Sequence, residues 1–205
     1  MIEDLDANSI DCSFVSNQIP YVMNALYNEN SLESVTLEEI RDAFRLKQVQ
    51  SKSWMMSHIS QLDKSKSILV IGSWLGFTSF CLSKLGFTNI TETDPDSRLS
   101  NIANHLNRSN KHFKHLDLDV NNLDNLNYDI VINTSCEHIA NNEWFQKVPT
   151  DTVMVLHSNN LEGYDHVNCC TDIADMIGKY PMDLIYAGSL DLVQYKRFML
   201  IGRKK

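Results

Sequence analysis

The chain has 205 residues, of which 43% are hydrophobic and 21% charged, and its formal net charge is −8 at pH 7. This length and composition are sufficient for one globular domain with a full core and a small appendage. The acidic balance disfavours a nucleic-acid partner, because the largest basic run is Arg203 to Lys205 at the end of the chain.

Targeting and redox signals point to an ordinary intracellular environment. The opening MIEDLDANSID lacks the apolar core of a signal peptide, and no apolar stretch reaches membrane-spanning length. Five cysteines, an odd number without a CxxC motif, indicate reduced thiols. We therefore expect a cytoplasmic protein with no membrane partner, while the oligomeric state stays open. His166, Cys169 and Cys170 lack the four ligands of a finger-like cluster, so no metal site is predicted.

Residues 1–63 are predicted to form an N-terminal helical cap or arm. An apolar patch from Ile19 to Leu26 favours a short helix that begins around Pro20. Thr36 and Glu39 have the spacing of a capping box, and the apolar residues that follow recur at mostly helical intervals as far as Leu62. This region is therefore either one long helix or two shorter ones.

Residues 64–205 are predicted to form a single α/β domain, because short apolar runs alternate with helical patterns. The expected strands are Ile68–Gly72, Asn89–Thr93, His112–Asp117, Tyr128–Asn133, Thr152–His157, Asp183–Gly188 and Tyr195–Gly202. The expected helices are Phe77–Leu85, Ser97–Asn107, Glu137–Phe145 and Thr171–Lys179. The last two strands are joined by too few residues for a helix and must pair antiparallel. The pattern predicts a doubly wound, seven-stranded, mostly parallel sheet that ends in an antiparallel hairpin.

The first of these strands runs directly into a glycine turn. Gly72 and Gly76 allow positive φ angles and a close approach of a ligand to the main chain. Trp74 stands where a dinucleotide-binding turn has its middle glycine, so a pyrophosphate would fit poorly. Glu92 lies 20 residues beyond Gly72, a spacing that favours an acid at the end of the next strand, where it would hold the hydroxyls of a ribose.

These motifs, over about residues 50–205, resemble those of the class I S-adenosylmethionine-dependent methyltransferases. ILVIGSWLG is similar to the family's first motif, and the Asp94-Pro95 pair after Glu92 also fits. Asp117, in FKHLD, occupies the third acidic motif, whose side chain and following N–H meet the adenine. The resemblance implies a Rossmann-like fold with S-adenosylmethionine as cofactor. The cofactor-binding residues that it implies are Gly72, Ser73, Trp74, Gly76, Glu92, Asp117, Leu118 and Asn133.

Catalytic candidates follow the fourth and fifth strands of this domain. YDIVINTSCEHI is similar to the FDxVxxxxxxEH stretch of the small-molecule branch, which places Glu137 and His138 near the transferred group. His157 ends the next predicted strand. A structural hydrogen bond is the alternative role for each histidine. The chain lacks the Asp/Asn-Pro-Pro-aromatic box of enzymes that methylate bases in DNA, so the resemblance implies a small-molecule acceptor.

Three functions remain open at this point. The first is methyl transfer to a small molecule. The second is transfer or cyclisation of the aminocarboxypropyl arm of the same cofactor, with release of methylthioadenosine. The third is a non-catalytic relative that binds the cofactor weakly or not at all.

Overall fold

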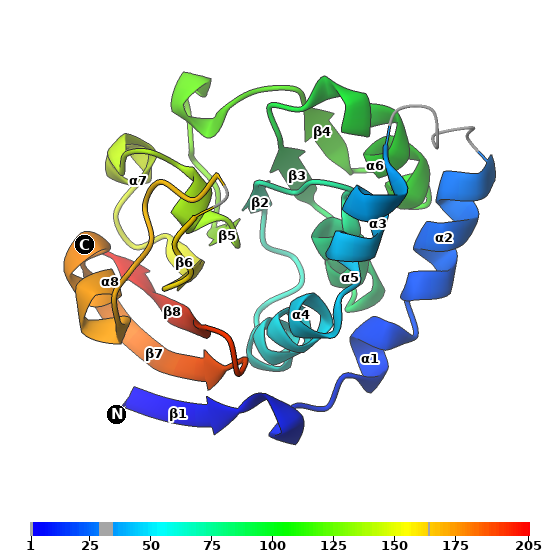
Figure 1. Cartoon of the computed structure of the whole chain (residues 1–205). Coiled ribbons are helices and arrows are strands. Elements are labelled where there is room, and N and C mark those ends of the chain that lie inside the picture. Colours follow the sequence, from blue (N-terminus) through cyan, green and yellow to red (C-terminus); the bar gives the residue numbers. More distant parts are fainter. Residues whose placement is uncertain (1, 29–34, 164) are drawn as a thin grey trace. The chain divides into compact units, whose positions relative to one another are not determined.

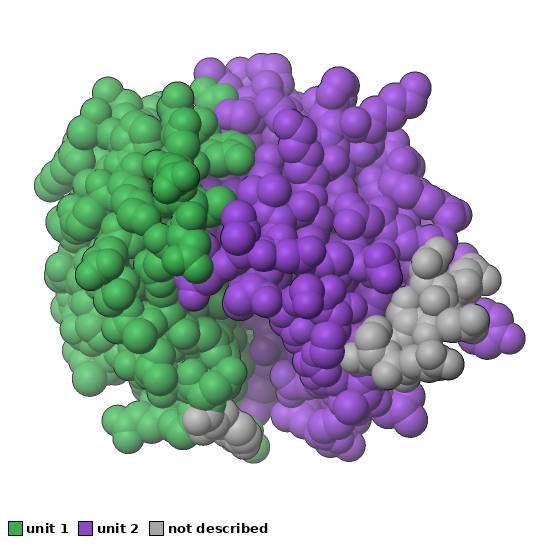
Figure 2. Space-filling model, turned by 90° about the horizontal axis from the view of Figure 1, so that it is seen from above, with its two compact units in different colours: residues 1–9, 120–205 green, residues 10–119 purple. Residues whose placement is uncertain are grey.

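The computed structural model describes residues 2–28, 35–163 and 165–205, and its elements are labelled in Figure 1. The chain divides into two compact units, coloured separately in Figure 2. The first unit comprises Met1–Ser9 and Val120–Lys205, and the second comprises Ile10–Asp119. The second unit thus includes most of the predicted N-terminal arm together with the first strands of the predicted domain. The boundary between residues 63 and 64 stays a prediction.

Three parallel strands in the order β2-β3-β4 form the sheet of the second unit. Its elements are α1 (Ser13–Ser16), α2 (Ile19–Asn28), α3 (Leu37–Ala43), α4 (Leu46–Ile59), β2 (Ile68–Ile71), α5 (Phe77–Lys84), β3 (Ile90–Thr93), η3 (Ser97–Leu99), α6 (Ser100–Asn107) and β4 (Lys114–Leu116). Every residue of β2 and β3 is buried. The aliphatic run that predicted β2 therefore forms a core strand, as expected for a parallel sheet.

The predicted capping box at the start of α3 is confirmed. The Thr36 hydroxyl accepts a hydrogen bond from the Glu39 N–H, and the Glu39 carboxylate accepts one from the Thr36 N–H at 2.7 Å. The helical pattern beyond it forms two helices rather than one, since α3 ends at Ala43 and α4 begins at Leu46. Trp54 in α4 is 1% exposed, so this helix also contributes to the core.

Five strands in the order β1-β7-β8-β6-β5 form the sheet of the first unit. Its elements are β1 (Ile2–Asp6), η1 (Ala7–Ser9), η4 (Val120–Asn122), β5 (Ile130–Asn133), η5 (Cys136–His138), α7 (Glu143–Lys147), β6 (Val153–Asn159), α8 (Ile173–Lys179), β7 (Met182–Asp191) and β8 (Lys196–Lys204). β8 runs between β6 and β7 and is antiparallel to both, which confirms the predicted terminal hairpin (Figure 1). β5 and β6 are parallel.

The structure departs from the predicted elements in several places, of which three concern the strand count and the candidate site. Strand β1 pairs parallel with β7, so the described residues contain eight strands rather than seven. The predicted helix from Glu137 to Phe145 is wrong: the chain forms the short turn η5 and then α7. The Glu137 C=O accepts the N–H groups of Val167 and Asn168, which takes it away from a helical partner. The strand expected to end at His157 continues to Asn159.

Among residues 2–28, 35–163 and 165–205, every helix is too short or too polar to span a membrane. All five cysteines are free.

Gly76 is required by packing as well as by backbone conformation. Its φ is +73°, and a Cβ built on it would lie 2.9 Å from both the Cα and the Cβ of Ala103 in α6. The Asn107 side chain donates to the Gly76 C=O at 3.1 Å and closes this contact. A side chain at position 76 would therefore force α6 away from the turn.

Replacing Gly76 by alanine is expected to destabilise the protein more than replacing Gly86. Gly86 also has a positive φ, of +97°, but a Cβ built on it would come no nearer than 3.9 Å to another atom. Left-handed backbone costs about 1–2 kcal/mol at either position, and overpacking adds about 1–3 kcal/mol at Gly76 alone. Urea unfolding of Gly76→Ala and Gly86→Ala measures the difference. Equal losses of stability would contradict the packing role.

Candidate functional site

The turn after β2, residues 72–76, has three residues in the left-handed region. Gly72, Trp74 and Gly76 have φ angles of +65°, +49° and +73°. A tryptophan in this region is uncommon, and such strain is concentrated at functional sites. The N–H groups of Gly72 and Ser73 donate to the Thr93 C=O at 3.0 and 3.4 Å. These two main-chain donors are therefore already paired within the protein.

Asp94 connects this turn to the end of β3. Its carboxylate accepts the Trp74 N–H at 2.8 Å and the Asp96 N–H at 3.0 Å. Burial raises the pKa of the Asp94 carboxyl above its ordinary 3.8, and the two N–H donors offset part of this rise. Asp94 is 9% exposed and follows the last residue of β3, so it is the acid at the carboxyl end of this strand.

Glu92, the predicted ribose ligand, lies inside β3 and is 0% exposed. One carboxylate oxygen accepts the Ser79 hydroxyl of α5, and the other bonds the His115 ring nitrogen Nδ1 at 2.8 Å. His115 is the register partner of Glu92 on β4. Both oxygens of Glu92 are therefore engaged within the core.

His115 links the two acids that the sequence assigned to the cofactor. Its other nitrogen, Nε2, lies 3.3 Å from a carboxylate oxygen of Asp117, whose side chain is 50% exposed. Burial lowers the pKa of His115, but the hydrogen bond to Glu92 and the charges of Glu92 and Asp117 outweigh it, so this pKa is raised above 6.5. The same Asp117 oxygen accepts the Ser100 hydroxyl at the start of α6. The N–H of Leu118, assigned to the adenine, donates to the Leu116 C=O at 2.9 Å.

Two predicted cofactor residues carry buried polar atoms that have no protein partner. Ser73, in the turn after β2, is 5% exposed, and Asn133, at the end of β5, is fully buried. The Asn133 side-chain oxygen accepts the Ser135 N–H at 2.9 Å. The Asn133 nitrogen Nδ2 and the Ser73 hydroxyl have no hydrogen-bond partner within the part of the chain that the structure describes. Unpaired buried groups of this kind are costly, and each needs an explanation such as a ligand or water.

Glu137 is held by a buried ion pair in the first unit. Its Oε1 accepts Arg197 Nη1 of β8 at 3.0 Å and the side-chain amide of Asn159 at the end of β6. Both charged side chains are nearly inaccessible, at 6% for Arg197 and 2% for Glu137. The second oxygen, Glu137 Oε2, is buried without a hydrogen-bond partner in the described residues.

The three predicted catalytic side chains occupy different environments. His138 is exposed at the end of η5, and its Nδ1 lies 3.3 Å from Asp165 Oδ2. Its ring packs edge-on against His166, with ring centroids 4.6 Å apart. His157 lies within β6 at 2% exposure, opposite Met199 of β8. Sequence reasoning did not group Arg197 with Glu137, since 60 positions separate them, whereas His166 is a further candidate in the loop after the fifth predicted strand.

The fold, unlike the sequence, matches known proteins. No protein-family model and no curated protein sequence matches the chain. The N-methyltransferase NodS from Bradyrhizobium japonicum WM9 superposes with a TM-score of 0.61 at 11% identity, over 79% of this chain and 98% of NodS. The magnesium protoporphyrin IX methyltransferase ChlM from Synechocystis PCC 6803, solved with bound SAM, gives 0.59 at 14% identity, over 88% and 94% of the two chains.

A third similar structure is the geranyl diphosphate C-methyltransferase from Streptomyces coelicolor A3(2), in complex with Mg²⁺, geranyl diphosphate and S-adenosyl-L-homocysteine. Its TM-score is 0.62 at 7% identity, over 78% of this chain and 81% of that one. Identities this low establish the fold alone. The chain therefore has the Rossmann-like fold of the class I methyltransferases, which confirms the fold class predicted from the sequence.

The raised pKa of His115 predicts a pH-dependent contribution to stability. Below its ordinary value of 6.5 the imidazole is protonated in both the folded and unfolded states, so its favourable interaction with Glu92 is fully present. As the pH rises through the higher folded-state pKa, this contribution is lost. The free energy of unfolding of the wild type, relative to a His115→Gln variant, should therefore fall as the pH rises above 6.5 and through the raised pKa of His115.

Urea unfolding of both proteins across this pH range measures the effect. A difference that is constant or increases with pH would contradict the assignment of a charged imidazole at His115.

Proposed function

We propose that this protein is an S-adenosylmethionine-dependent methyltransferase that acts on a small molecule. The fold supports the proposal, because the three similar proteins named above are methyltransferases. Two of them were solved with this cofactor or with S-adenosyl-L-homocysteine. The fold alone does not specify chemistry. The side chains at the carboxyl ends of the strands therefore have to supply the evidence for cofactor binding and chemistry.

The observation that carries the proposal is the unpaired hydroxyl of Ser73, in the turn after β2. This turn follows a buried parallel strand, and open α/β sheets bind their ligands at the carboxyl ends of such strands. A hydroxyl is a suitable partner for the carboxylate or amino group at the methionine end of the cofactor. The Ser73 hydroxyl is buried and has no partner among the described residues, as expected if a ligand completes it. In the first unit, Asn133 at the end of β5 stays a predicted cofactor residue.

We further propose that Asp94, rather than Glu92, holds the ribose. Both residues lie on the same face of their strand, since they are two positions apart. Glu92 is fully enclosed and has both oxygens bonded, whereas Asp94 lies at the strand end. The two N–H groups that Asp94 accepts occupy only part of the capacity of a carboxylate, which has about four acceptor positions. Asp117 remains the candidate for the adenine, with its orientation set by Ser100 and His115.

The cofactor, when bound, supplies an electrophilic methyl group to a nucleophile of the substrate. The protein must hold that nucleophile in line and accept its proton. Of the predicted catalytic residues, His138 has an accessible ring. Glu137 and His157 are buried, and Glu137 is bonded to Arg197, which favours a positioning role for it. The small-molecule class of the acceptor and the cytoplasmic location stay predictions of the sequence.

Product analysis tests the function directly. Incubation of the protein and S-adenosylmethionine with a panel of small hydroxyl, amine and thiol acceptors should release S-adenosylhomocysteine in amounts equal to the methylated product. Release of methylthioadenosine would instead show that the aminocarboxypropyl arm is used. If neither product forms and neither S-adenosylmethionine nor S-adenosylhomocysteine produces heat or a thermal shift at about millimolar concentration, the proposal fails.

A further inference from the structure

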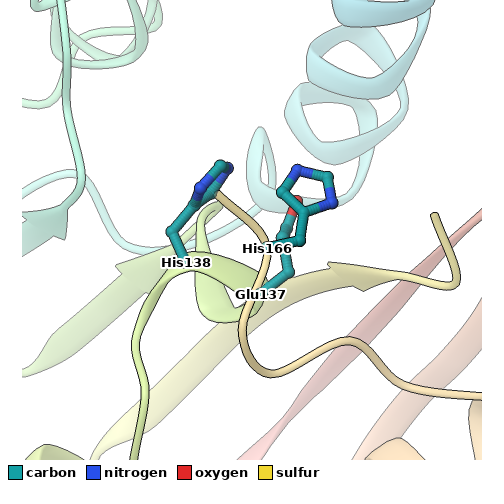
Figure 3. Close-up of side chains that lie close together, drawn as sticks. All are labelled: Glu137, His138 and His166. Atoms are coloured by element: carbon teal, nitrogen blue, oxygen red, sulfur yellow. The ribbon is translucent and has the colours of Figure 1, made fainter. Parts of the chain in front are cut away.

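We propose that Glu137, His138 and His166 form a binding site for one divalent transition-metal ion. The three side chains come from η5 and from the loop between β6 and α8, all within the first unit. A carboxylate oxygen of Glu137 and one ring nitrogen from each histidine lie within 4.8 Å of one another. Figure 3 shows the two imidazoles side by side and at a steep angle to each other, with a carboxylate oxygen of Glu137 next to the His166 ring.

The Glu137 oxygen that remains unpaired points to a missing ligand. Arg197 and Asn159 both bond Oε1, which fixes the carboxylate and leaves Oε2 buried with no hydrogen-bond partner in the described residues. An ionised carboxylate oxygen in this position is costly unless a cation or donor completes it. Since Arg197 is committed to Oε1, a metal ion on Oε2 would make the carboxylate a bridge between two positive charges.

Each histidine is oriented by a partner on its Nδ1 atom. His166 Nδ1 lies 2.6 Å from the Leu161 C=O, and His138 Nδ1 lies 3.3 Å from the Asp165 carboxylate. A carbonyl or carboxylate on one ring nitrogen fixes the tautomer that presents the other nitrogen, Nε2, to a metal. Metal-binding histidines almost always have such an outer partner. The edge-on packing of the two rings, at an interplanar angle of 86°, keeps their nitrogens close without stacking.

Two imidazoles and one carboxylate suit Zn²⁺, Co²⁺, Mn²⁺ or Fe²⁺ better than the oxygen-preferring Mg²⁺ or Ca²⁺. Metal–ligand bonds of about 2.0–2.2 Å place tetrahedral ligand atoms about 3.4 Å apart. The observed atoms, within 4.8 Å of one another, therefore have to approach by at most about 1.4 Å, and the exposed side chain of His138 has room to move.

This inference rests on the proposed function where it concerns the substrate. Three protein ligands leave at least one coordination position open, as in catalytic zinc sites. An oxygen of the acceptor in that position would lose its proton more readily, since a bound metal lowers the pKa of a hydroxyl. The substrate class is then a small molecule with a hydroxyl or phenol group as the methyl acceptor.

Calorimetric titration of the chelator-treated protein with Co²⁺ alone, together with the visible absorption of the bound ion, tests the site. We expect one equivalent to bind, with the absorption of a nitrogen- and oxygen-ligated ion. His138→Ala and His166→Ala should each weaken binding by at least about tenfold to a hundredfold, since even outer-shell partners have effects of this size. His112→Ala, which removes an exposed histidine of the second unit, is the matched control and should bind as the wild type does.

Three results would overturn the metal site. The first is no binding of Co²⁺ or Zn²⁺ at up to about millimolar concentration, and the second is equal metal affinity in the two histidine variants and the control. The third is a thiolate charge-transfer band, which would place the ion on Cys169 or Cys170. Titration of the same samples with S-adenosylhomocysteine separates this outcome from failure of the proposed function. A wild-type protein that binds the cofactor but not the metal refutes the metal site alone, and one that binds the metal but not the cofactor refutes the proposed function alone.

Discussion

The hydrogen bond from the Trp74 N–H to the Asp94 carboxylate is the constraint on which the proposed cofactor region depends. A tryptophan at φ +49° costs about 1–3 kcal/mol in backbone strain. A hydrogen bond to a charged group contributes about 1.5–3 kcal/mol, which is enough to offset that strain. The turn therefore keeps its left-handed shape without the middle glycine, and the same bond aligns it with the end of β3.

Each unit also contains a buried carboxylate with a nitrogen partner. In the second unit Glu92 bonds His115, and in the first unit Glu137 bonds Arg197. Such pairs contribute little net stability after desolvation, but removal of one partner leaves an unpaired buried group that costs several kcal/mol, about 3–5 for a buried ion pair. These pairs position side chains: Glu92 fixes the His115 ring that approaches Asp117, and Arg197 fixes the Glu137 carboxylate, whose buried Oε2 has no hydrogen-bond partner in the described residues.

Much of the fold could be predicted because buried parallel strands are continuous apolar runs. The run ILVI of β2 needs no tertiary information to be recognised. Strand β1 could not be predicted: IEDLD has two apolar residues, four of its five residues are exposed, and it is defined by pairing with β7 about 180 positions away. The helix expected over Glu137–Phe145 failed for a similar reason, since a distant loop binds the Glu137 carbonyl.

The candidate site was predictable to the level of the strand but not of the residue. The spacing of the motif placed an acid at the end of β3, but Glu92 and Asp94 lie on the same face of that strand. The burial of Glu92 in the structure is what distinguishes the core residue from the candidate ribose ligand. His115 is two positions before Asp117, but its contact with Glu92 depends on strand register. His166 joins His138 only through the path of a loop, for which the sequence carries no signal.

We propose that Asp94 at the end of β3 holds the ribose of the cofactor, while Glu92 hydrogen-bonds to core residues and stabilises the fold. Calorimetric titration with S-adenosylhomocysteine of the parent, Asp94→Asn and Glu92→Gln tests it most directly, since both changes are isosteric. Asp94→Asn should weaken binding about tenfold to a hundredfold, and Glu92→Gln should leave affinity within about threefold while lowering stability. Parent-like affinity in Asp94→Asn, or a large loss confined to Glu92→Gln, would contradict the account.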